Sequence, residues 1–328
     1  MKKVTVIIKA LNEEKNIARA IESSLKAFKG YNGEVILVDS LSTDKTIEIA
    51  KKYPIKIFQL KNINDRSCGV GPQVGYLHSK GDYIYILDGD MELSEKFIAE
   101  AIKELDADKQ LAGVGGKIYE MNIGNIIFER RRKKSYYKTN EAKYTNKLMM
   151  GGLYKRELID EVGYFSNPSL HSYEESDLGH RLTMVGYKLK RIPIDMINHY
   201  GHTTSSSKIF LNMWKSKYLW GCGELLRYHL GKPTFFKVIV ELKIYLLVIL
   251  WWIILILFLI LYKPYSILLK IQLALTFALL LLFLIKKRRI AEFLFSIFSW
   301  NITALALILG FLQKPKDIYR KFEIIRIK

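Results

Sequence analysis

Only two cysteines, Cys68 and Cys222, occur among the 328 residues, and their spacing does not match a metal site. This excludes a disulfide framework, and we expect both thiols to be reduced. The first apolar run, Val4 to Ile8, is too short for the core of a signal peptide. The sequence also lacks internal repeats and low-complexity tracts. We therefore expect the amino-terminal part to fold in the reducing cytosol.

Negative charge is scarce: 51 lysines and arginines face 32 acidic residues, which gives a net charge of +19. No aromatic-basic RNA signature and no helix-turn-helix pattern accompanies this charge, so nucleic acid is not an expected partner. Basic runs at Arg130 to Lys134 and at Lys286 to Arg289 would face anionic headgroups if the molecule lies against a bilayer. For the first run a solvated loop is the alternative. Membrane lipids are the predicted partner.

Long apolar runs are confined to the last third of the chain. Ile244 to Tyr262 is unbroken and matches the roughly 20 residues that a bilayer-crossing helix needs. Tyr265 to Ile285 follows after the tight Lys263-Pro264 connection, so the two runs predict a hairpin whose ends return to one side. Ile290 to Leu312 is a third candidate span.

The distribution of positive charge predicts the membrane topology. Lys286 to Arg289 and the basic tail, residues 314–328, should both be cytosolic, but a third full crossing would put the tail outside. We therefore expect the third segment to be interfacial or re-entrant, with a bend near Trp300-Asn301, and a full crossing is the alternative. The predicted location is the cell membrane, multi-pass, with the amino-terminal domain in the cytoplasm.

The first 90 residues alternate short apolar runs with helical stretches, which is typical of an α/β fold with a mostly parallel, Rossmann-like sheet. The runs and stretches are Val4 to Ile8, Glu14 to Phe28, Glu34 to Val38, Asp44 to Tyr53, Ile55 to Gln59 and Tyr83 to Leu87. We expect four regions: a catalytic domain over 1–205, an amphipathic interfacial helix region over 206–235, transmembrane helices over 236–313 and a basic cytosolic tail over 314–328.

Acidic and polar side chains follow three of the predicted strands. Asp88-Gly89-Asp90 comes directly after the third of these, and Asn12 and Ser42-Thr43 are predicted caps of the helices after the first two. The carboxyl ends of parallel strands form the edge where open α/β sheets bind ligands. Carboxylates placed there suit a magnesium-like cation and a phosphorylated ligand.

Four motifs occur in order, and a known family shares them: Leu11-Asn12-Glu13-Glu14, Val38-Asp39-Ser40 with Ser42-Thr43-Asp44, Asp88-Gly89-Asp90, and Glu174-Glu175-Ser176-Asp177-Leu178. In this order and spacing they resemble the family 2 inverting glycosyltransferases with the GT-A fold. The resemblance extends from Lys3 to His202, about two thirds of the chain. It implies a nucleotide-diphosphate sugar donor, linked to UDP or GDP, and a magnesium or manganese ion.

The resemblance also implies roles for individual residues. Asp39, with Ser40, is similar to the group that binds the nucleobase, and Asp88 is similar to the ribose or sugar contact. Asp90 resembles the ligand of the metal ion that bridges the diphosphate. Asp88 and His199 are further metal candidates, and a structural role is the alternative for the histidine. The remaining donor-loop residues implied are Leu11, Asn12, Glu13 and Gly89.

One donor contact departs from the family pattern. Many relatives carry Arg-Asn in the loop before the Asp-x-Asp strand, whereas this chain has Gly71-Pro72-Gln73-Val74-Gly75 there. Arg66, in the same loop, is the candidate replacement.

The acidic segment near residue 175 resembles the site of the family's catalytic base. The base position falls on Glu175, but the family often has Glu-Asp where this chain has Glu174-Glu175, so Glu174 is the alternative. Asp177, in the same acidic segment, is a further catalytic candidate. Glycosyl transfer needs a carboxylate to take the acceptor proton and a cation to neutralise the departing diphosphate. A single displacement with the base opposite the leaving group inverts the anomeric carbon.

The membrane segments suggest a lipid-linked acceptor. The main hypothesis is transfer of a sugar to a hydroxyl of a polyprenyl- or dolichyl-linked saccharide. The alternative is a polyprenyl-phosphate sugar synthase, whose ionised acceptor needs no base. A non-catalytic sugar-nucleotide sensor is a third possibility, and the intact acidic motifs argue against it.

Overall fold

The chain divides into two compact units. The computed structural model describes residues 2–28, 30–133, 140–201 and 203–328, so that Lys134 and His202 lie outside the described residues. Unit 1 comprises Met1–Tyr218 together with Pro315–Lys328, and unit 2 comprises Leu219–Lys314.

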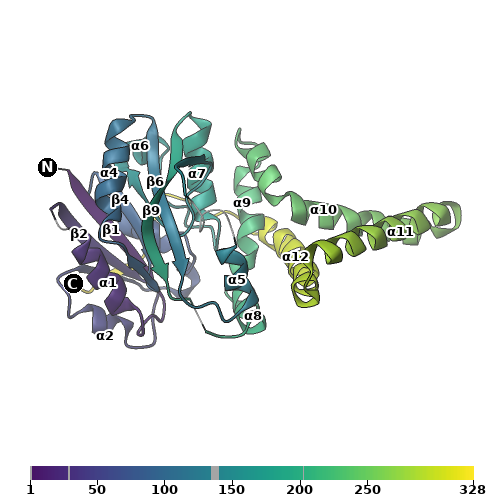
Figure 1. The fold of residues 1–328 in the computed structure, drawn as a ribbon, viewed down its shortest axis with the longest axis horizontal. Helices are drawn as coiled ribbons and strands as arrows, with labels where there is room; N and C mark the ends of the chain where they lie inside the picture. The colour runs from purple at the N-terminus through teal and green to yellow at the C-terminus, as the bar shows by residue number, and fades with distance from the viewer. Residues whose placement is uncertain (1, 29, 134–139, 202) are drawn as a thin grey trace. The chain divides into compact units, whose positions relative to one another are not determined.

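Unit 1 is built on one mixed sheet, whose strands among the described residues follow the order β10-β3-β2-β1-β4-β8-β6-β9-β5, with β7 paired to β9. The strands are β1 Lys3–Ala10, β2 Asn32–Asp39, β3 Lys56–Leu60, β4 Tyr83–Asp88, β5 Met91–Leu93, β6 Leu111–Glu120, β7 Lys143–Thr145, β8 Gly152–Lys155, β9 Lys188–His199 and β10 Ile324–Arg326. Neighbours are parallel within β3-β2-β1-β4 and between β6 and β9, and antiparallel elsewhere (Figure 1). The predicted α/β fold is confirmed, with parallel pairing concentrated in the amino-terminal half.

Helices cover both faces of this sheet. Those of unit 1 are α1 Ile17–Lys26, α2 Thr46–Ala50, α3 Val70–Leu77, α4 Phe97–Ala107, α5 Ile126–Arg132, α6 Arg156–Glu161, α7 Glu174–Met184 and α8 Ser206–Lys215, with a 3-10 turn at Ile63–Asp65. Apolar side chains of α1 and α4 share one hydrophobic core, and those of α6 and α7 share another on the opposite face. Strand β1 contributes side chains to both cores: Val4, Val6 and Ile8 pack in the first core and Ile7 packs in the second. This two-sided burial explains its nearly continuous apolar sequence.

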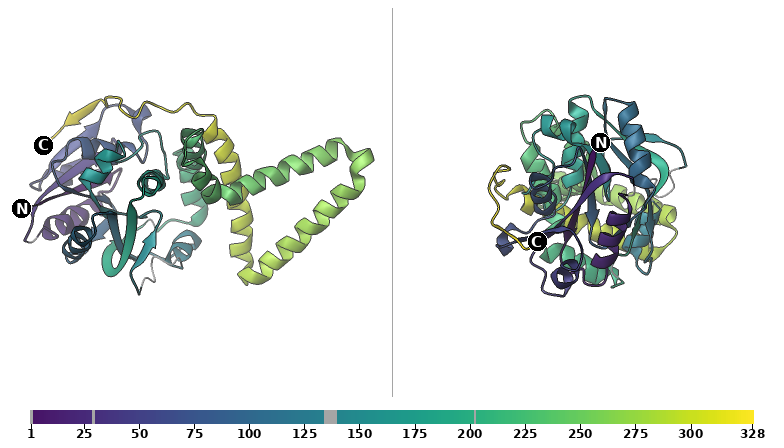
Figure 2. Two further views of the ribbon diagram at one scale, coloured as in Figure 1. Left: turned by 90° about the horizontal axis from the view of Figure 1, so that it is seen from above. Right: turned by 90° about the vertical axis from the view of Figure 1, so that its left-hand side faces the viewer.

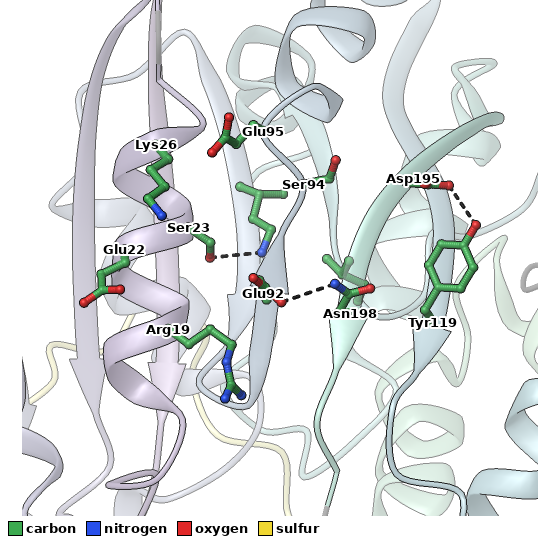
Figure 3. A pocket seen from close by; sticks show the side chains of 12 residues that line it. Arg19, Glu22, Ser23, Lys26, Glu92, Ser94, Glu95, Tyr119, Asp195 and Asn198 are labelled. Carbon is green, nitrogen blue, oxygen red and sulfur yellow. Dashed lines mark hydrogen bonds between the residues drawn. The ribbon is translucent and has the colours of Figure 1, made fainter.

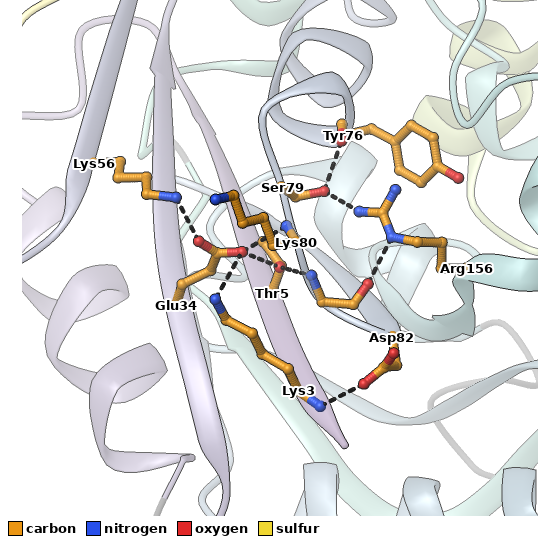
Figure 4. A network of polar contacts seen from close by, with 10 residues as sticks. Lys3, Thr5, Glu34, Lys56, Tyr76, Ser79, Lys80, Asp82 and Arg156 are labelled. Atoms are coloured by element: carbon orange, nitrogen blue, oxygen red, sulfur yellow. Dashed lines mark hydrogen bonds and ion pairs between the residues drawn. The ribbon is translucent and has the colours of Figure 1, made fainter. Parts of the chain in front are cut away.

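A polar network fastens the amino ends of the first three strands (Figure 4). Glu34, on β2, accepts hydrogen bonds from Thr5 Oγ1 at 2.9 Å and from Lys56 Nζ at 2.6 Å. It also accepts one from the backbone amide of Lys80 at 2.7 Å. The opposite, carboxyl ends of these strands carry the loops with the predicted site residues.

Two predicted helix starts are wrong by a few residues. Helix α1 begins at Ile17 rather than Glu14, and α2 begins at Thr46 rather than Asp44. The reason is that Asn12 does not cap a helix: it has φ +58° and its side-chain oxygen accepts a hydrogen bond from Thr43 N at 2.8 Å. The polar side chains therefore tie the two loops together.

Unit 2 contains α9 Gly221–His229, α10 Phe235–Ile260, α11 Tyr262–Lys287 and α12 Ile290–Phe311. The last three are long and apolar enough to cross a membrane. Within the unit, α10 and α11 meet at one end, and α12 runs across between their other ends, so that the three helices outline a triangle (Figure 2).

Helix α12 packs closely on α9. A Cβ atom at Gly223 would lie 2.0 Å from the Leu307 carbonyl oxygen, and one at Gly310 would lie 2.1 Å from that of Trp220. Only glycine permits this approach of the two backbones. A third of the apolar stretch of α12 is buried, whereas no residue of the corresponding stretch of α10 is.

The predicted amphipathic helix region, residues 206–235, contains two helices, α8 and α9, and Lys217 takes a left-handed φ of +60° between them. Two other features of the carboxyl-terminal half differ from the sequence prediction. The predicted bend at Trp300-Asn301 is wrong, since α12 is unbroken there. Residues 324–326, within the predicted basic tail, form strand β10 of the unit 1 sheet.

Candidate functional site

The carboxyl ends of β1, β2 and β4 lie side by side. In the parallel register Ala10 is opposite Asp39, and Lys9 is opposite Asp88. The loops that follow are fastened by Asn12 N, which donates to Ser42 Oγ at 2.8 Å. The structure thus brings three of the predicted motifs to one edge of the sheet, and Leu11 is 42% exposed there.

Asp39 is fully buried at the end of β2. Its carboxylate accepts hydrogen bonds from Ser42 N at 2.9 Å and from Gln59 Nε2, on β3, at 2.8 Å, and Ser42 Oγ also donates to it. Asp39 therefore shapes the loop over residues 40–42, whose residues, including Ser40, are partly exposed.

Arg66 holds the same loop from the other side. Its Nε donates to the carbonyl oxygen of Ser40 at 2.7 Å, and its Nη2 donates to that of Leu41. Leu41 has a left-handed φ of +62°, an uncommon conformation for a leucine. These guanidinium contacts fix the backbone of the loop over residues 40–42.

Asp88, Gly89 and Asp90 turn tightly beside Glu13. A Cβ atom at Gly89 would lie 2.8 Å from Glu13 Cγ, so glycine is needed here to let the two loops meet. Burial raises the pKa of Glu13 to about 8, and the neighbouring charges of Asp90 and Asp88 add to this rise. Carboxyl groups crowded in this way are stabilised by a cation.

His199 lies between two carboxylates. Its Nε2 is 3.1 Å from Asp90 Oδ2, and its Nδ1 is 2.5 Å from Glu120 Oε2, a residue that the sequence did not single out. Burial lowers the pKa of His199, but the hydrogen bonds to Asp90 and Glu120 outweigh burial and raise it to about 9. Both ring nitrogens of His199 therefore face carboxylates, and one of these belongs to Asp90, the predicted metal ligand.

Lys9 links the carboxyl end of β4 to the first turn of α7. Its Nζ lies 3.2 Å from Asp88 Oδ1 and 2.9 Å from Glu174 Oε1. Burial opposes the charge on Lys9, but Asp88 and Glu174 outweigh burial and raise its pKa, so the ammonium group is retained. Asp88 and Glu174, far apart in the sequence, therefore converge on the ammonium group of Lys9, a residue that the sequence analysis did not single out.

Glu175 is held differently from its neighbour Glu174. Its Oε1 accepts a hydrogen bond from Met150 N at 2.7 Å. Burial, reinforced by the charge of Glu174, raises the pKa of Glu175 to about 7. Both glutamates and Lys9 line a cavity of about 20 Å³, which has room for one water molecule.

Asp177 does not line this cavity. It is fully buried, and it accepts hydrogen bonds from Tyr164 Oη at 3.1 Å and from Arg181 Nε at 3.0 Å. Arg181 also donates to the carbonyl oxygen of Tyr164 at 2.7 Å. These contacts tie α7 to the preceding loop.

A larger cavity of about 290 Å³ lies elsewhere in unit 1, between α1 and strands β5 and β9 (Figure 3). Both acidic and basic side chains line its walls. Two of the acidic ones accept hydrogen bonds from neighbouring wall residues: Glu92 from Asn198, and Asp195 from Tyr119. None of the predicted site residues lines it. We therefore place the candidate site at the carboxyl edge of β1, β2 and β4.

The predicted metal ligands do not form a complete site by themselves. Among residues 2–28, 30–133, 140–201 and 203–328, no group of three or more His, Cys, Asp or Glu side chains is arranged to hold a metal ion. The carboxylates of Asp88 and Asp90 beside Glu13 nevertheless fit a magnesium-like ion, which commonly takes one or two protein carboxylates and completes its shell with substrate phosphates.

Comparisons with known proteins point to glycosyltransferases. The family model described as glycosyl transferase family 2 matches residues 5–163. The chain is 25% identical over 225 residues to the dolichyl N-acetyl-alpha-D-glucosaminyl phosphate 3-beta-D-2,3-diacetamido-2,3-dideoxy-beta-D-glucuronosyltransferase of Methanococcus voltae, covering 63% of this chain and 69% of that protein. It is 26% identical over 114 residues to the dolichol-phosphate mannosyltransferase of Pyrococcus furiosus, covering 34% of this chain and 32% of that protein.

Solved structures share the fold. The crystal structure of S. aureus TarS 1–349 in complex with UDP-GlcNAc aligns with a TM-score of 0.55 and 18% identity, covering 71% of this chain and 68% of that one. At this identity the likeness concerns the fold alone.

Proposed function

The chain belongs to the family 2 glycosyltransferases with the GT-A fold, and on this premise we propose that it transfers a sugar from a nucleotide-diphosphate donor to a hydroxyl of a polyprenyl- or dolichyl-linked saccharide. The observation that carries the proposal is the convergence of Asp88, from the end of β4, and Glu174, from the head of α7, on Lys9 Nζ. These contacts connect the carboxyl edge of the sheet, which would receive the donor, with helix α7, which would carry the base.

Glu175 is the proposed base. Its pKa of about 7 suits a group that must take a proton near neutral pH. The carboxylate of Glu174 is instead engaged by Lys9, whose Nζ lies 2.9 Å from Glu174 Oε1. The displaced diphosphate would leave on the opposite face of the sugar, so the anomeric configuration inverts.

The metal-dependent step is proposed from the donor set. Asp90 would hold a magnesium or manganese ion, with Asp88 beside it, and the ion would neutralise charge on the departing diphosphate. We assign His199 a positioning role, because it lies between Asp90 and Glu120 and donates to both. Asp177 likewise positions α7 through Arg181.

The proposed donor is a UDP- or GDP-linked sugar. Its base would lie against the loop over residues 40–42, which Asp39 and Arg66 shape. The TarS structure that shares the fold was solved with UDP-GlcNAc, which supports a nucleotide sugar without fixing the base for this chain.

The lipid-linked acceptor is supported by the relatives' names and by the apolar helices of unit 2. One relative transfers a sugar to a dolichyl-phosphate-linked saccharide by name, and another is named a dolichol-phosphate mannosyltransferase. The second name also supports the alternative, a polyprenyl-phosphate sugar synthase. A phosphate acceptor needs no base, so the buried Glu175 favours a hydroxyl acceptor.

Transfer assays can separate these functions. Membranes containing the full chain are incubated with a panel of UDP- and GDP-sugars and with either polyprenyl phosphates or polyprenyl-linked saccharides. We expect sugar to be added to the lipid-linked saccharide in the presence of Mg²⁺ or Mn²⁺. Product formed only on the bare lipid phosphate would establish the alternative, and the absence of any lipid product would contradict both.

We also propose that unit 1 is cytosolic and that unit 2 enters and leaves the membrane on the same side. Unit 1 contains the chain both before and after unit 2, and β10 is hydrogen-bonded into its sheet. Both ends of unit 2 must therefore reach one side of the bilayer, which requires an even number of crossings. Helices α10 and α11 would cross, and α12, packed on the charged helix α9, would lie at the interface.

Tags at two positions test this topology in sealed vesicles. A tag after Lys328 should be cleaved or protected together with unit 1, and a tag inserted after Leu261, between α10 and α11, should behave in the opposite way. A carboxyl terminus on the side opposite unit 1 would contradict the proposal. So would a tag after Leu261 on the same side as unit 1, because α10 and α11 would then not cross.

A further inference from the structure

The carboxyl-terminal segment, residues 315–328, returns to the sheet of unit 1 after the apolar helices. Strand β10 runs antiparallel to β3, with Ile325 opposite Gln59. Lys61 N donates to the Glu323 carbonyl oxygen at 2.9 Å, and Ile327 N donates to that of Ile57 at 2.8 Å. The segment therefore covers the edge of β3, which would otherwise present unpaired backbone groups.

The strand that β10 covers contributes directly to the donor loop. Gln59, on β3, is also paired with Asp39 on the neighbouring strand β2, and its Nε2 donates to Asp39 Oδ2 at 2.8 Å. Asp39 in turn binds Ser42 N at 2.9 Å. A continuous set of hydrogen bonds thus leads from β10 through Gln59 to the loop over residues 40–42.

A second set of contacts joins the same segment to Arg66. Arg320 Nη2 lies 2.9 Å from Asp65 Oδ1, with both side chains mostly shielded, and Lys316 Nζ donates to the Asn64 carbonyl oxygen at 2.9 Å. Asp65 directly precedes Arg66, whose Nε donates to the Ser40 carbonyl oxygen at 2.7 Å. This set therefore ends at the same donor loop.

We propose that β10 and the Arg320–Asp65 ion pair position the loop that receives the donor nucleotide, so that Arg320 is a positioning residue for donor binding. The inference rests on the proposed use of a nucleotide sugar. Two independent sets of contacts, one through the sheet and one through the loop before Arg66, end at residues 40–42. Binding sites keep their geometry through such supporting contacts, and small displacements of a contacting group weaken binding strongly.

A charge-reversal series on the full-length protein tests this role. Arg320→Glu and Asp65→Arg each place like charges at the ion pair, and the double variant restores opposite charges. We expect each single variant to raise the donor KM, and the Kd of UDP or GDP, about tenfold, with kcat changed less than about twofold. The double variant should recover most of the affinity. Lys321→Glu makes the same charge change at the adjacent, exposed residue and should leave donor KM unchanged.

Several outcomes would overturn the proposal. One is a single variant that lowers only the melting temperature and leaves nucleotide affinity unchanged, because the ion pair would then serve folding alone. Another is a double variant that shows no recovery. If the Arg320 variants do not fold, Asp65→Asn removes the same ion pair from the other side and must itself weaken nucleotide binding. Nucleotide affinity is measured in the absence of sugar transfer. A wild-type protein that binds UDP or GDP but glycosylates no lipid refutes the proposed function alone. A wild-type protein that binds neither UDP nor GDP refutes both the proposed function and the positioning role of Arg320.

Discussion

The Glu175→Gln variant is expected to bind the sugar nucleotide as the wild type does and to transfer the sugar roughly 10²- to 10⁴-fold more slowly. Glutamine has the shape of glutamate but cannot take the proton of the acceptor hydroxyl. The fold should survive, because an amide oxygen can still accept the hydrogen bond that Met150 N donates at 2.7 Å. Single-turnover rates and donor affinity, measured on the purified full chain, separate the two effects.

The pH profile gives a second readout of the same residue. Burial and the charge of Glu174 raise the pKa of Glu175 to about 7, and a base acts only when it is ionised. Wild-type turnover should therefore be low in acid, rise through about pH 7 and level off above it. The Glu175→Gln variant should lack this rise.

Glu174→Gln is the matched control. This glutamate accepts a hydrogen bond from Lys9 Nζ at 2.9 Å, so its loss should disturb donor binding more than the proton transfer. If Glu174→Gln abolishes transfer with normal donor binding while Glu175→Gln remains active, the base is Glu174.

The parallel half of the sheet could be predicted from the sequence because its strands are buried on both faces. Apolar runs such as Val4 to Ile8 leave few alternatives to a parallel α/β sheet, and the rule that loops meet at the carboxyl edge then places Asp39 and Asp88 together. These steps use only local patterns and one general property of parallel sheets.

The contacts between distant segments could not be predicted in this way. Lys9 looks like an ordinary residue near the end of a strand, and its role appears only when Asp88 and Glu174 reach it in the folded chain. Glu120, at the end of β6, likewise gives no sequence signal of its contact with His199. Each depends on pairings between residues far apart in sequence, which periodicity does not encode.

The carboxyl-terminal segment illustrates a conflict between two signals. Its lysines and arginines predict a solvated basic tail, yet Ile324 and Ile325 pair with β3. Three residues are too few for a strand pattern to stand out, so charge dominates the prediction. The free edge of β3, which decides the outcome, is visible only in the folded sheet.

The Asp90→Asn variant is expected to lose metal-dependent donor binding and, with it, nearly all transfer. Asp90 lies beside Glu13 and His199, so removing its charge also removes part of the repulsion that raises the pKa of Glu13. A neutral amide oxygen binds a divalent cation more weakly than a carboxylate does, because the negative charge is lost. Affinity for UDP or GDP, measured with and without Mn²⁺ or Mg²⁺, should therefore depend on metal in the wild type and not in the variant.

Asp195→Asn is the matched control, since it makes the same change at an exposed residue whose carboxylate contacts Tyr119. It should retain metal-dependent binding and transfer. If the Asp90→Asn variant has unchanged activity, Asp90 is not part of the site. If the variant loses transfer but its nucleotide binding still depends on metal, His199 and Asp90 orient the donor without holding the ion. In the first result, turnover is unchanged. In the second result, turnover is lost although donor binding still depends on the metal, so the defect lies in the position of the sugar and not in charge neutralisation on the diphosphate.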